Sequence, residues 1–127
     1  EVIGFDDADI DDAFSRSDSL VLACPLTELT EGLVDEDALL SLPIDAIVVN
    51  IARGQVIETD ALVTALQTNM IRGAALDVTD PEPLPQDSPL WELQNCYITP
   101  HNAGHTPQYW DRCADILAEA LTTHNVG

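Results

Sequence analysis

Positive charge is scarce in this sequence. Four Lys plus Arg residues stand against 23 Asp plus Glu, which gives a formal net charge of −19. Nucleic acids and anionic membranes are bound mainly through basic surface, so neither is expected as a partner. The acidic residues are spread through apolar, periodic segments instead of forming a tail, which indicates a folded and strongly acidic surface. Such a surface resembles that of halophilic proteins, in which concentrated salt screens self-repulsion.

Cysteines are also few. Cys24, Cys96 and Cys113 are odd in number, lie far apart and form no C-x-x-C motif, so neither a disulfide framework nor a metal site is expected. The sequence shows no signal-peptide pattern and no apolar run near 18 residues. These absences favour a soluble chain in a reducing, cytoplasmic setting.

Short apolar runs alternate with segments of helical periodicity. The runs predict buried strands over residues 2–5, 19–24, 46–50, 73–76 and 97–98. Helices are predicted near residues 10–14, over 37–42 with Asp35 as cap, over 60–67 with Thr59 as cap, and over 110–123 after Thr106-Pro107. This alternation indicates an α/β fold with a parallel sheet covered on both faces. At 127 residues the chain is one domain or part of one.

Polar side chains follow three of the predicted strands. Arg53 comes shortly after the strand at 46–50, Asp77 directly after 73–76, and His101 shortly after 97–98. Ligands of open α/β sheets bind beyond the carboxyl ends of the strands, where these residues would meet. The sequence therefore predicts a site at that edge of the sheet.

The residue types at this edge suit proton exchange beside a carboxylate. His101 exchanges a proton readily near neutral pH, and a carboxylate bonded to its ring, from Glu82 or Asp77, would favour the charged imidazolium. Arg53 is shaped to hold a substrate carboxylate by two parallel hydrogen bonds. Each residue also has a plain structural explanation: a surface salt bridge for Arg53, a solvated loop for Glu82, a cap for Asp77. His105 and His124 are interpreted as structural.

Three stretches in this order resemble one protein family. They read N-I-A-R-G with V-I-E-T-D-A-L after it, then G-A-A-L-D-V-T-D-P-E-P-L-P, then L-W-E-L-Q-N-C-Y-I-T-P-H-N-A-G-H-T. Together they look like the signature of the D-isomer-specific 2-hydroxyacid dehydrogenases, and the resemblance runs from about residue 17 to the last helix. It implies an NAD(P)-dependent oxidoreductase that interconverts a small 2-keto acid and a D-2-hydroxy acid, and a homodimer in the full-length protein.

The resemblance also implies roles for individual residues. Arg53 matches the arginine that binds the substrate, His101 the general acid–base, and Glu82 its carboxylate partner. In reduction, hydride would pass from the nicotinamide to the keto carbon while His101 protonates the oxygen. Further positions match cofactor contacts: Asp77 at the nicotinamide carboxamide, Ile51, Ala52, Asn102, Ala103 and Gly104 through the backbone, and Cys24, Pro25 and Thr30 at the adenosine end.

One family feature is missing. The six glycines, at positions 4, 32, 54, 73, 104 and 127, form no G-x-G-x-x-G. The expected fold is therefore the C-terminal half of a Rossmann-type domain over residues 1–106, with a crossover helix over 107–127 toward an absent substrate domain. Without the glycine-rich turn that receives the pyrophosphate, the chain alone is expected to bind NAD weakly and to be inactive.

Two alternatives remain open. Corepressors that resemble this family keep the fold and bind NAD without catalysis, but the presence of Arg53, Glu82 and His101 together favours an enzyme. Chains similar to formate dehydrogenases carry Gln where Glu82 stands. Glu31 occupies a position where the family often has a basic residue, which weakens any preference for NADP.

Overall fold

A computed structural model describes residues 10–123. The strand predicted at 2–5 and His124 lie outside these residues. The elements follow in the order α1 (Ile10–Ser15), β1 (Ser19–Leu22), α2 (Glu36–Ser41), β2 (Ile47–Asn50), the 3-10 turn η1 (Gly54–Val56), α3 (Thr59–Gln67), β3 (Gly73–Leu76), the 3-10 turn η2 (Pro89–Glu92), β4 (Cys96–Ile98) and α4 (Tyr109–Thr123).

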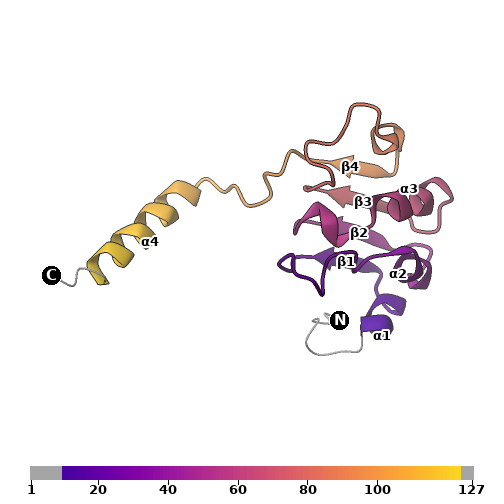
Figure 1. Cartoon of the computed structure of the whole chain (residues 1–127), viewed down its shortest axis with the longest axis horizontal. Helices are drawn as coiled ribbons and strands as arrows, with labels where there is room; N and C mark the ends of the chain where they lie inside the picture. The colour runs from indigo at the N-terminus through magenta and orange to yellow at the C-terminus, as the bar shows by residue number, and fades with distance from the viewer. Residues whose placement is uncertain (1–9, 124–127) are drawn as a thin grey trace.

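The four described strands form one parallel sheet in the order β1-β2-β3-β4. The predicted α/β class is thus confirmed, and four of the predicted strands are present within two residues of their expected bounds. Because all strands run in the same direction, their carboxyl ends share one edge (Figure 1). This edge carries the turns that hold the candidate site.

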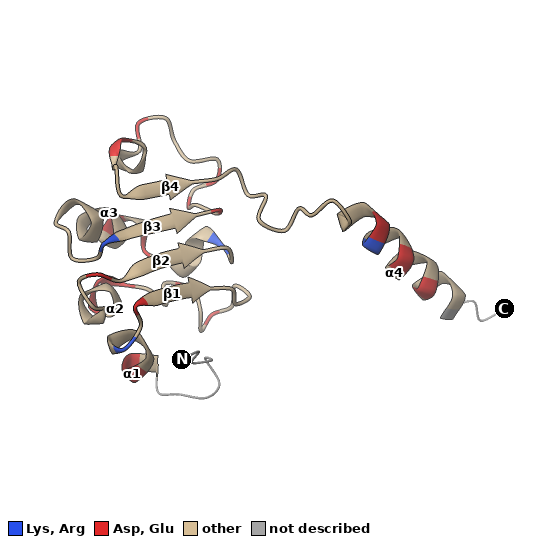
Figure 2. Ribbon diagram, turned by 180° about the vertical axis from the view of Figure 1, so that it is seen from behind, with Lys and Arg blue, Asp and Glu red and all other residues tan. Residues whose placement is uncertain are grey.

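One face of the sheet is buried and the other is largely exposed. Successive side chains in a strand point to opposite faces, so in-register residues share a face. One face packs into the core beneath α2 and α3, and the in-register row on it is Leu20, Val48, Ala74 and Cys96. The other in-register row is Val21, Val49, Ala75 and Tyr97. On that face Val21 and Tyr97 are 56% and 73% exposed, and Figure 2 shows the strands in front of the helices. Cover on both faces is therefore not found among residues 10–123.

Two predicted helix caps have different outcomes. Asp35 caps α2, and its carboxylate accepts a hydrogen bond from the Ala38 amide at 2.8 Å. The prediction of Thr59 as the cap of α3 is wrong, because Glu58 is the cap residue and its side chain makes no capping bond. Thr59 lies inside the first turn, and its hydroxyl donates to the Asp80 carbonyl at 3.0 Å. The hydroxyl thus ties α3 to the loop after β3.

Helix α4 stands away from the sheet (Figures 1 and 2). It begins two residues after Pro107, close to the predicted start. Side chains from Tyr109 to Thr122 are all exposed, including Trp110 at 76% and Leu117 at 60%. An amphipathic helix usually buries its apolar stripe, so this helix presents that stripe without cover from the described sheet. Neither α4 nor any other described helix combines the length and apolarity needed to cross a bilayer.

Candidate active site

The turn after β2 is closed by the last residue of that strand. Asn50 is 1% exposed, its Oδ1 accepts from the Ala52 amide at 3.0 Å, and its Nδ2 donates to the Arg53 carbonyl at 2.9 Å. A buried amide bonded on both sides fixes the backbone of a short turn. Sequence reasoning did not assign Asn50 a role, although a polar residue at the end of an apolar run was a usable signal.

Arg53 lies on this turn as an exposed cation. Its Nη1 donates to the neighbouring Ala52 carbonyl at 2.6 Å, and it makes no ion pair with any residue of the described range 10–123. Gly54 follows it, and a Cβ at that position would collide with the backbone of Thr79. Glycine is therefore needed for the close approach of the Arg53 turn to the loop after β3.

The loop after β3 brings a carboxylate to the histidine. His101 Nδ1 lies 2.9 Å from Glu82 Oε1, and the two side chains are 46% and 42% exposed. Of the two partners that the sequence left open, Glu82 is the one that contacts the ring. Since Nδ1 faces Glu82, the Nε2 atom of His101 is the ring nitrogen left for a substrate. The geometry suits an acid–base group oriented by a carboxylate.

The Glu82 loop is itself held in place. Thr79 Oγ1 donates to the Pro81 carbonyl at 3.1 Å, and Gln55 Nε2 donates to Asp80 Oδ1 at 3.2 Å. The peptide bonds Asp80–Pro81 and Glu82–Pro83 are both cis. The Gln55–Asp80 hydrogen bond connects this loop to the turn after Arg53.

Asp77 holds the backbone of the histidine loop. Its carboxylate is buried at 6% exposure and accepts three hydrogen bonds: Thr99 Oγ1 to Oδ1 at 2.6 Å, the Asn102 amide to Oδ1 at 2.9 Å, and the Ala103 amide to Oδ2 at 2.8 Å. Burial acts to raise the pKa of Asp77, but these hydrogen bonds and nearby His101 outweigh it, so the pKa lies below its ordinary value. Asp77 is therefore a charged anchor for the segment around His101.

The other residues predicted to contact a cofactor lie at the same edge. Cys24 and Pro25 follow β1. The buried Thr30 donates its hydroxyl to the Pro25 carbonyl at 2.7 Å, which holds the loop close to the end of β1. Ile51 exposes 46% of its surface beyond β2, whereas the Ala52 amide is bonded to Asn50.

The histidine loop offers few free amides. Because the Asn102 and Ala103 amides donate to Asp77, cofactor contacts from this loop would fall to Gly104 and to side chains or carbonyl groups.

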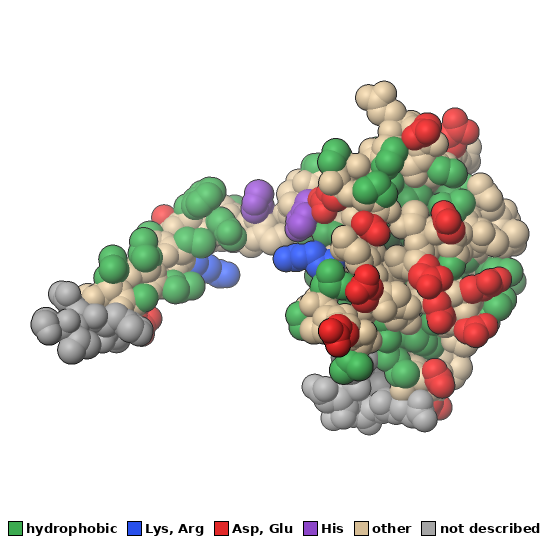
Figure 3. Space-filling model, in the orientation of Figure 1, with side chains coloured by type: hydrophobic (Ala, Val, Ile, Leu, Met, Phe, Trp, Pro, Cys, Tyr) green, Lys and Arg blue, Asp and Glu red, His purple; other side chains and the backbone are tan. Residues whose placement is uncertain are grey.

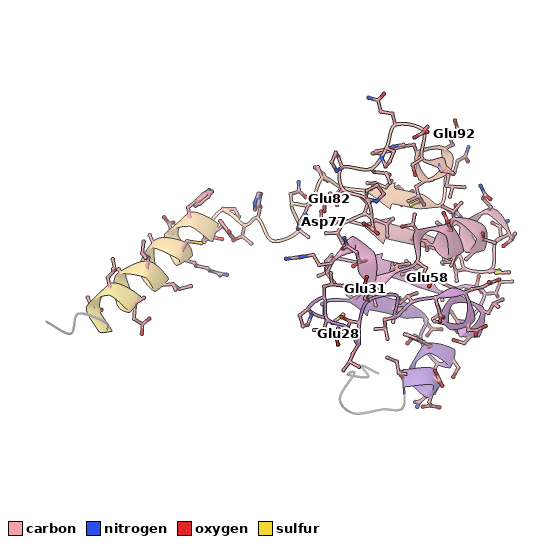
Figure 4. The ribbon with its side chains drawn as sticks, in the orientation of Figure 1. Glu28, Glu31, Glu58, Asp77, Glu82 and Glu92 are labelled. Carbon is pink, nitrogen blue, oxygen red and sulfur yellow. The ribbon has the colours of Figure 1, made fainter. Side chains whose placement is uncertain are left out.

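The figures show how these groups gather. Asp77 and Glu82 both lie at the carboxyl edge of the sheet, and Glu28 and Glu31 lie at the same end of the described structure, nearer β1 (Figure 4). Basic, histidine and acidic side chains meet where the chain leaves the body toward α4 (Figure 3). No cluster of His, Cys, Asp and Glu among residues 10–123 could hold a metal ion. The edge therefore offers an arginine and a carboxylate–histidine pair without a metal centre.

Comparison with known proteins adds family evidence to this geometry. The family model described as "D-isomer specific 2-hydroxyacid dehydrogenase, NAD binding domain" matches residues 1–103. A human relative named glyoxylate reductase/hydroxypyruvate reductase is 47% identical over 87 residues, which cover 68% of this chain and 26% of the relative.

Solved structures agree in fold. A D-isomer specific 2-hydroxyacid dehydrogenase from Lactobacillus delbrueckii ssp. bulgaricus, in its NAD-complexed form, has a TM-score of 0.85 at 30% identity and covers 94% of this chain. One from Xanthobacter autotrophicus Py2, in complex with NADPH and MES, has a TM-score of 0.74 at 37% identity and covers 87%. The matches cover 42% and 48% of those chains. The chain thus spans less than half the length of each of these three relatives.

Proposed function

Because the chain belongs to the D-isomer-specific 2-hydroxyacid dehydrogenase family and matches its NAD-binding domain, we propose that it forms the cofactor side of a 2-keto acid reductase. The observation that carries this proposal is the Glu82–His101 pair at 2.9 Å, at the same sheet edge as Arg53. Arg53 would bind the substrate carboxylate and carbonyl, and His101 would be the general acid. The corepressor-type alternative is not favoured, because the human and Lactobacillus relatives are a reductase and a dehydrogenase.

The residues at this edge fit the two ends of a nicotinamide dinucleotide. The Asp77 carboxylate has about four acceptor positions, and three are filled, which leaves one for a carboxamide N–H. The exposed Ile51 side chain offers an apolar surface beside it. Cys24, Pro25 and Thr30 would line the adenosine end. The sequence contains no glycine-rich turn for the pyrophosphate, so this half of the site would supply only part of the binding.

The chain's own residues account for orientation and proton transfer. When bound, the reduced nicotinamide supplies the hydride for the keto carbon. Arg53 would fix the substrate by charge-assisted hydrogen bonds to its carboxylate and would polarise its carbonyl. His101 would donate a proton from Nε2 to the carbonyl oxygen as charge develops there. Glu82 would stabilise the imidazolium before that transfer and fix its orientation.

Substrate, cofactor and setting follow as parts of the proposal. The human relative's name suggests glyoxylate and hydroxypyruvate as first substrates to test. Either NAD or NADP would serve, and Glu31 weakens any preference for NADP. We also propose a cytoplasmic homodimer adapted to concentrated salt, which would not bind nucleic acid or membranes, as the charge of −19 suggests.

The test uses a full-length enzyme that carries this chain, with glyoxylate and hydroxypyruvate and with NADH and NADPH. Arg53→Lys keeps the charge but loses the planar fork, so catalytic efficiency should fall about 10- to 100-fold while cofactor affinity stays unchanged. The matched control is Arg72→Lys at an exposed position, which should change neither. Absence of keto-acid reduction by the parent, or equal losses of efficiency and cofactor affinity in Arg53→Lys, would contradict the proposal.

A further inference from the structure

His101 has a left-handed backbone conformation, which is uncommon for residues other than glycine. Its φ is 49°, and among the described residues other than glycine only Asn69 shares a positive φ. A left-handed residue with a side chain persists only where the surrounding structure fixes it. The His101 side chain is 46% exposed and contacts Glu82 through Nδ1, and the backbone around it is held by further hydrogen bonds.

Thr99 makes several hydrogen bonds that fix the backbone before His101. The Thr99 amide donates to the Leu76 carbonyl at 2.9 Å and continues the pairing of β3 with β4. The Thr99 carbonyl then accepts from the His101 amide at 3.0 Å, which closes a tight turn at Pro100. Its hydroxyl reaches Asp77 Oδ1 at 2.6 Å, the shortest of the three hydrogen bonds to that carboxylate. Thr99 therefore contacts both the turn before His101 and the anchor that holds the residues after it.

We propose that Thr99 is a positioning residue for His101, acting through the Asp77 carboxylate. The hydroxyl of Thr99 holds one carboxylate oxygen, and the two oxygens then receive the amides of Asn102 and Ala103. These hydrogen bonds fix the backbone before and after His101 and so hold its ring in contact with Glu82. The inference deepens the proposed function and rests on it, because His101 matters as the proton donor to the substrate.

If Thr99 served only to pack the fold, loss of its hydroxyl would change overall stability but not the titration of Asp77. Thr99 is exposed, so its methyl group contributes little to the core, and a Val in its place keeps the shape while removing the hydroxyl. Burial acts to raise the pKa of Asp77, and the Thr99 hydroxyl is the leading cause that lowers it, ahead of the Ala103 and Asn102 amides and His101. Loss of the hydroxyl should thus be visible in the titration of Asp77 and not only in overall stability.

The test is NMR on the 127-residue chain with Thr99→Val and Thr99→Ser. In Thr99→Val the Asp77 carboxyl should titrate at a higher pH than in the parent, and the Asn102 and Ala103 amides should exchange with solvent about 2- to 10-fold faster. Thr99→Ser keeps a hydroxyl and should restore both measurements. The control is Thr122→Val, which removes an exposed hydroxyl bonded to the Glu119 carbonyl and should change neither.

Two outcomes would overturn the proposal. One is a folded Thr99→Val chain with an unchanged Asp77 titration and unchanged amide exchange. The other, which applies even if Thr99→Val fails to fold, is a Thr99→Ser chain whose Asp77 titration departs from that of the parent.

Activity separates this proposal from the proposed function. In a full-length enzyme, Thr99→Val should lower kcat several-fold, and Thr99→Ser should recover it. A parent without keto-acid reduction contradicts the proposed function but leaves the NMR result intact. An active parent with an unaffected Thr99→Val variant contradicts only the positioning role.

Discussion

The loop that carries His101 and the helix α4 that follows it are separated by only a few residues, yet their support differs. Asp77 fixes the loop by accepting hydrogen bonds from Thr99, Asn102 and Ala103. Side chains of α4 from Tyr109 to Thr122 are exposed, and the helix stands off the sheet. A segment without regular structure thus has more tertiary contacts to the sheet edge than the regular helix beside it. The candidate site at this edge is held by hydrogen-bonded loops, whereas the apolar stripe of α4 has no cover from the described sheet.

The largest expected contrast concerns core packing. Leu62 of α3 is 2% exposed and Leu117 of α4 is 60% exposed. Leu62→Ala should lower the free energy of unfolding by about 2–5 kcal/mol, since it leaves a cavity in a packed interior. Leu117→Ala should change it by less than about 0.5 kcal/mol, as surface substitutions usually do. Urea unfolding of both variants measures this, and similar losses would mean that α4 packs on the body in solution.

The next contrast compares two glycines of the site. A Cβ on Gly54 would collide with the Thr79 backbone, whereas one on Gly104 meets nothing within 4 Å. Gly54→Ala should destabilise the chain by about 1–3 kcal/mol through overpacking, and Gly104→Ala should leave stability unchanged. Thermal unfolding followed by circular dichroism tests the pair. A neutral Gly54→Ala would show that the Arg53 turn does not depend on close approach to the β3 loop.

Acid should remove part of the stability that Asp77 contributes to the His101 loop. The pKa of Asp77 is lowered in the folded chain, so its charged form stabilises the fold above the ordinary carboxyl pKa. That contribution is lost as the pH falls through the folded-state pKa. Asp77→Asn lacks this term, so its stability should fall less than the parent's between about pH 5 and pH 3. Urea unfolding of the parent and of Asp77→Asn at these pH values measures the change. Equal losses of unfolding free energy in the two chains would contradict the assignment of Asp77 as a charged anchor.

The smallest expected effect is that of salt on the acidic surface. At a formal net charge of −19, the charged groups of the chain repel one another in dilute buffer. The Debye length falls from ~10 Å at 0.1 M to ~3 Å at 1 M, so molar KCl should screen most of this repulsion. Circular dichroism from low to molar KCl should show a gain of structure. Full folding that is independent of salt would remove the halophilic interpretation.

The sequence predicted the architecture because its signals were local. Apolar runs of two to six residues indicated the strands, and Asp35 indicated the start of α2. Arg53, Asp77 and His101 each follow a strand in the sequence. A parallel topology then places them at one edge of the sheet. Thr59 was wrongly assigned as a cap because its hydroxyl bonds a loop 21 residues away, which no local pattern reports.

The support of the site was less predictable. Glu82 and Asp77 were equivalent as partners of His101 in the sequence, since only the folded loops decide which carboxylate reaches the ring. Asn50 acts through two side-chain hydrogen bonds within its turn, and Thr99 acts through one to Asp77. Such geometry depends on the tertiary structure. For α4, periodicity predicted an amphipathic helix but could not indicate which surface covers it.

The pH dependence of keto-acid reduction tests the central claim most directly, because it reports on the Glu82–His101 pair at work. Reduction needs protonated His101, and a carboxylate partner favours the protonated ring. In a full-length enzyme that carries this chain, Glu82→Gln should move the fall of the reductive rate to lower pH, because the carboxylate 2.9 Å from Nδ1 is lost. Glu92→Gln, an exposed carboxylate on the far side of the body in Figure 4, should leave the profile in place. An unchanged profile in Glu82→Gln would contradict the assignment of this pair as the acid–base centre.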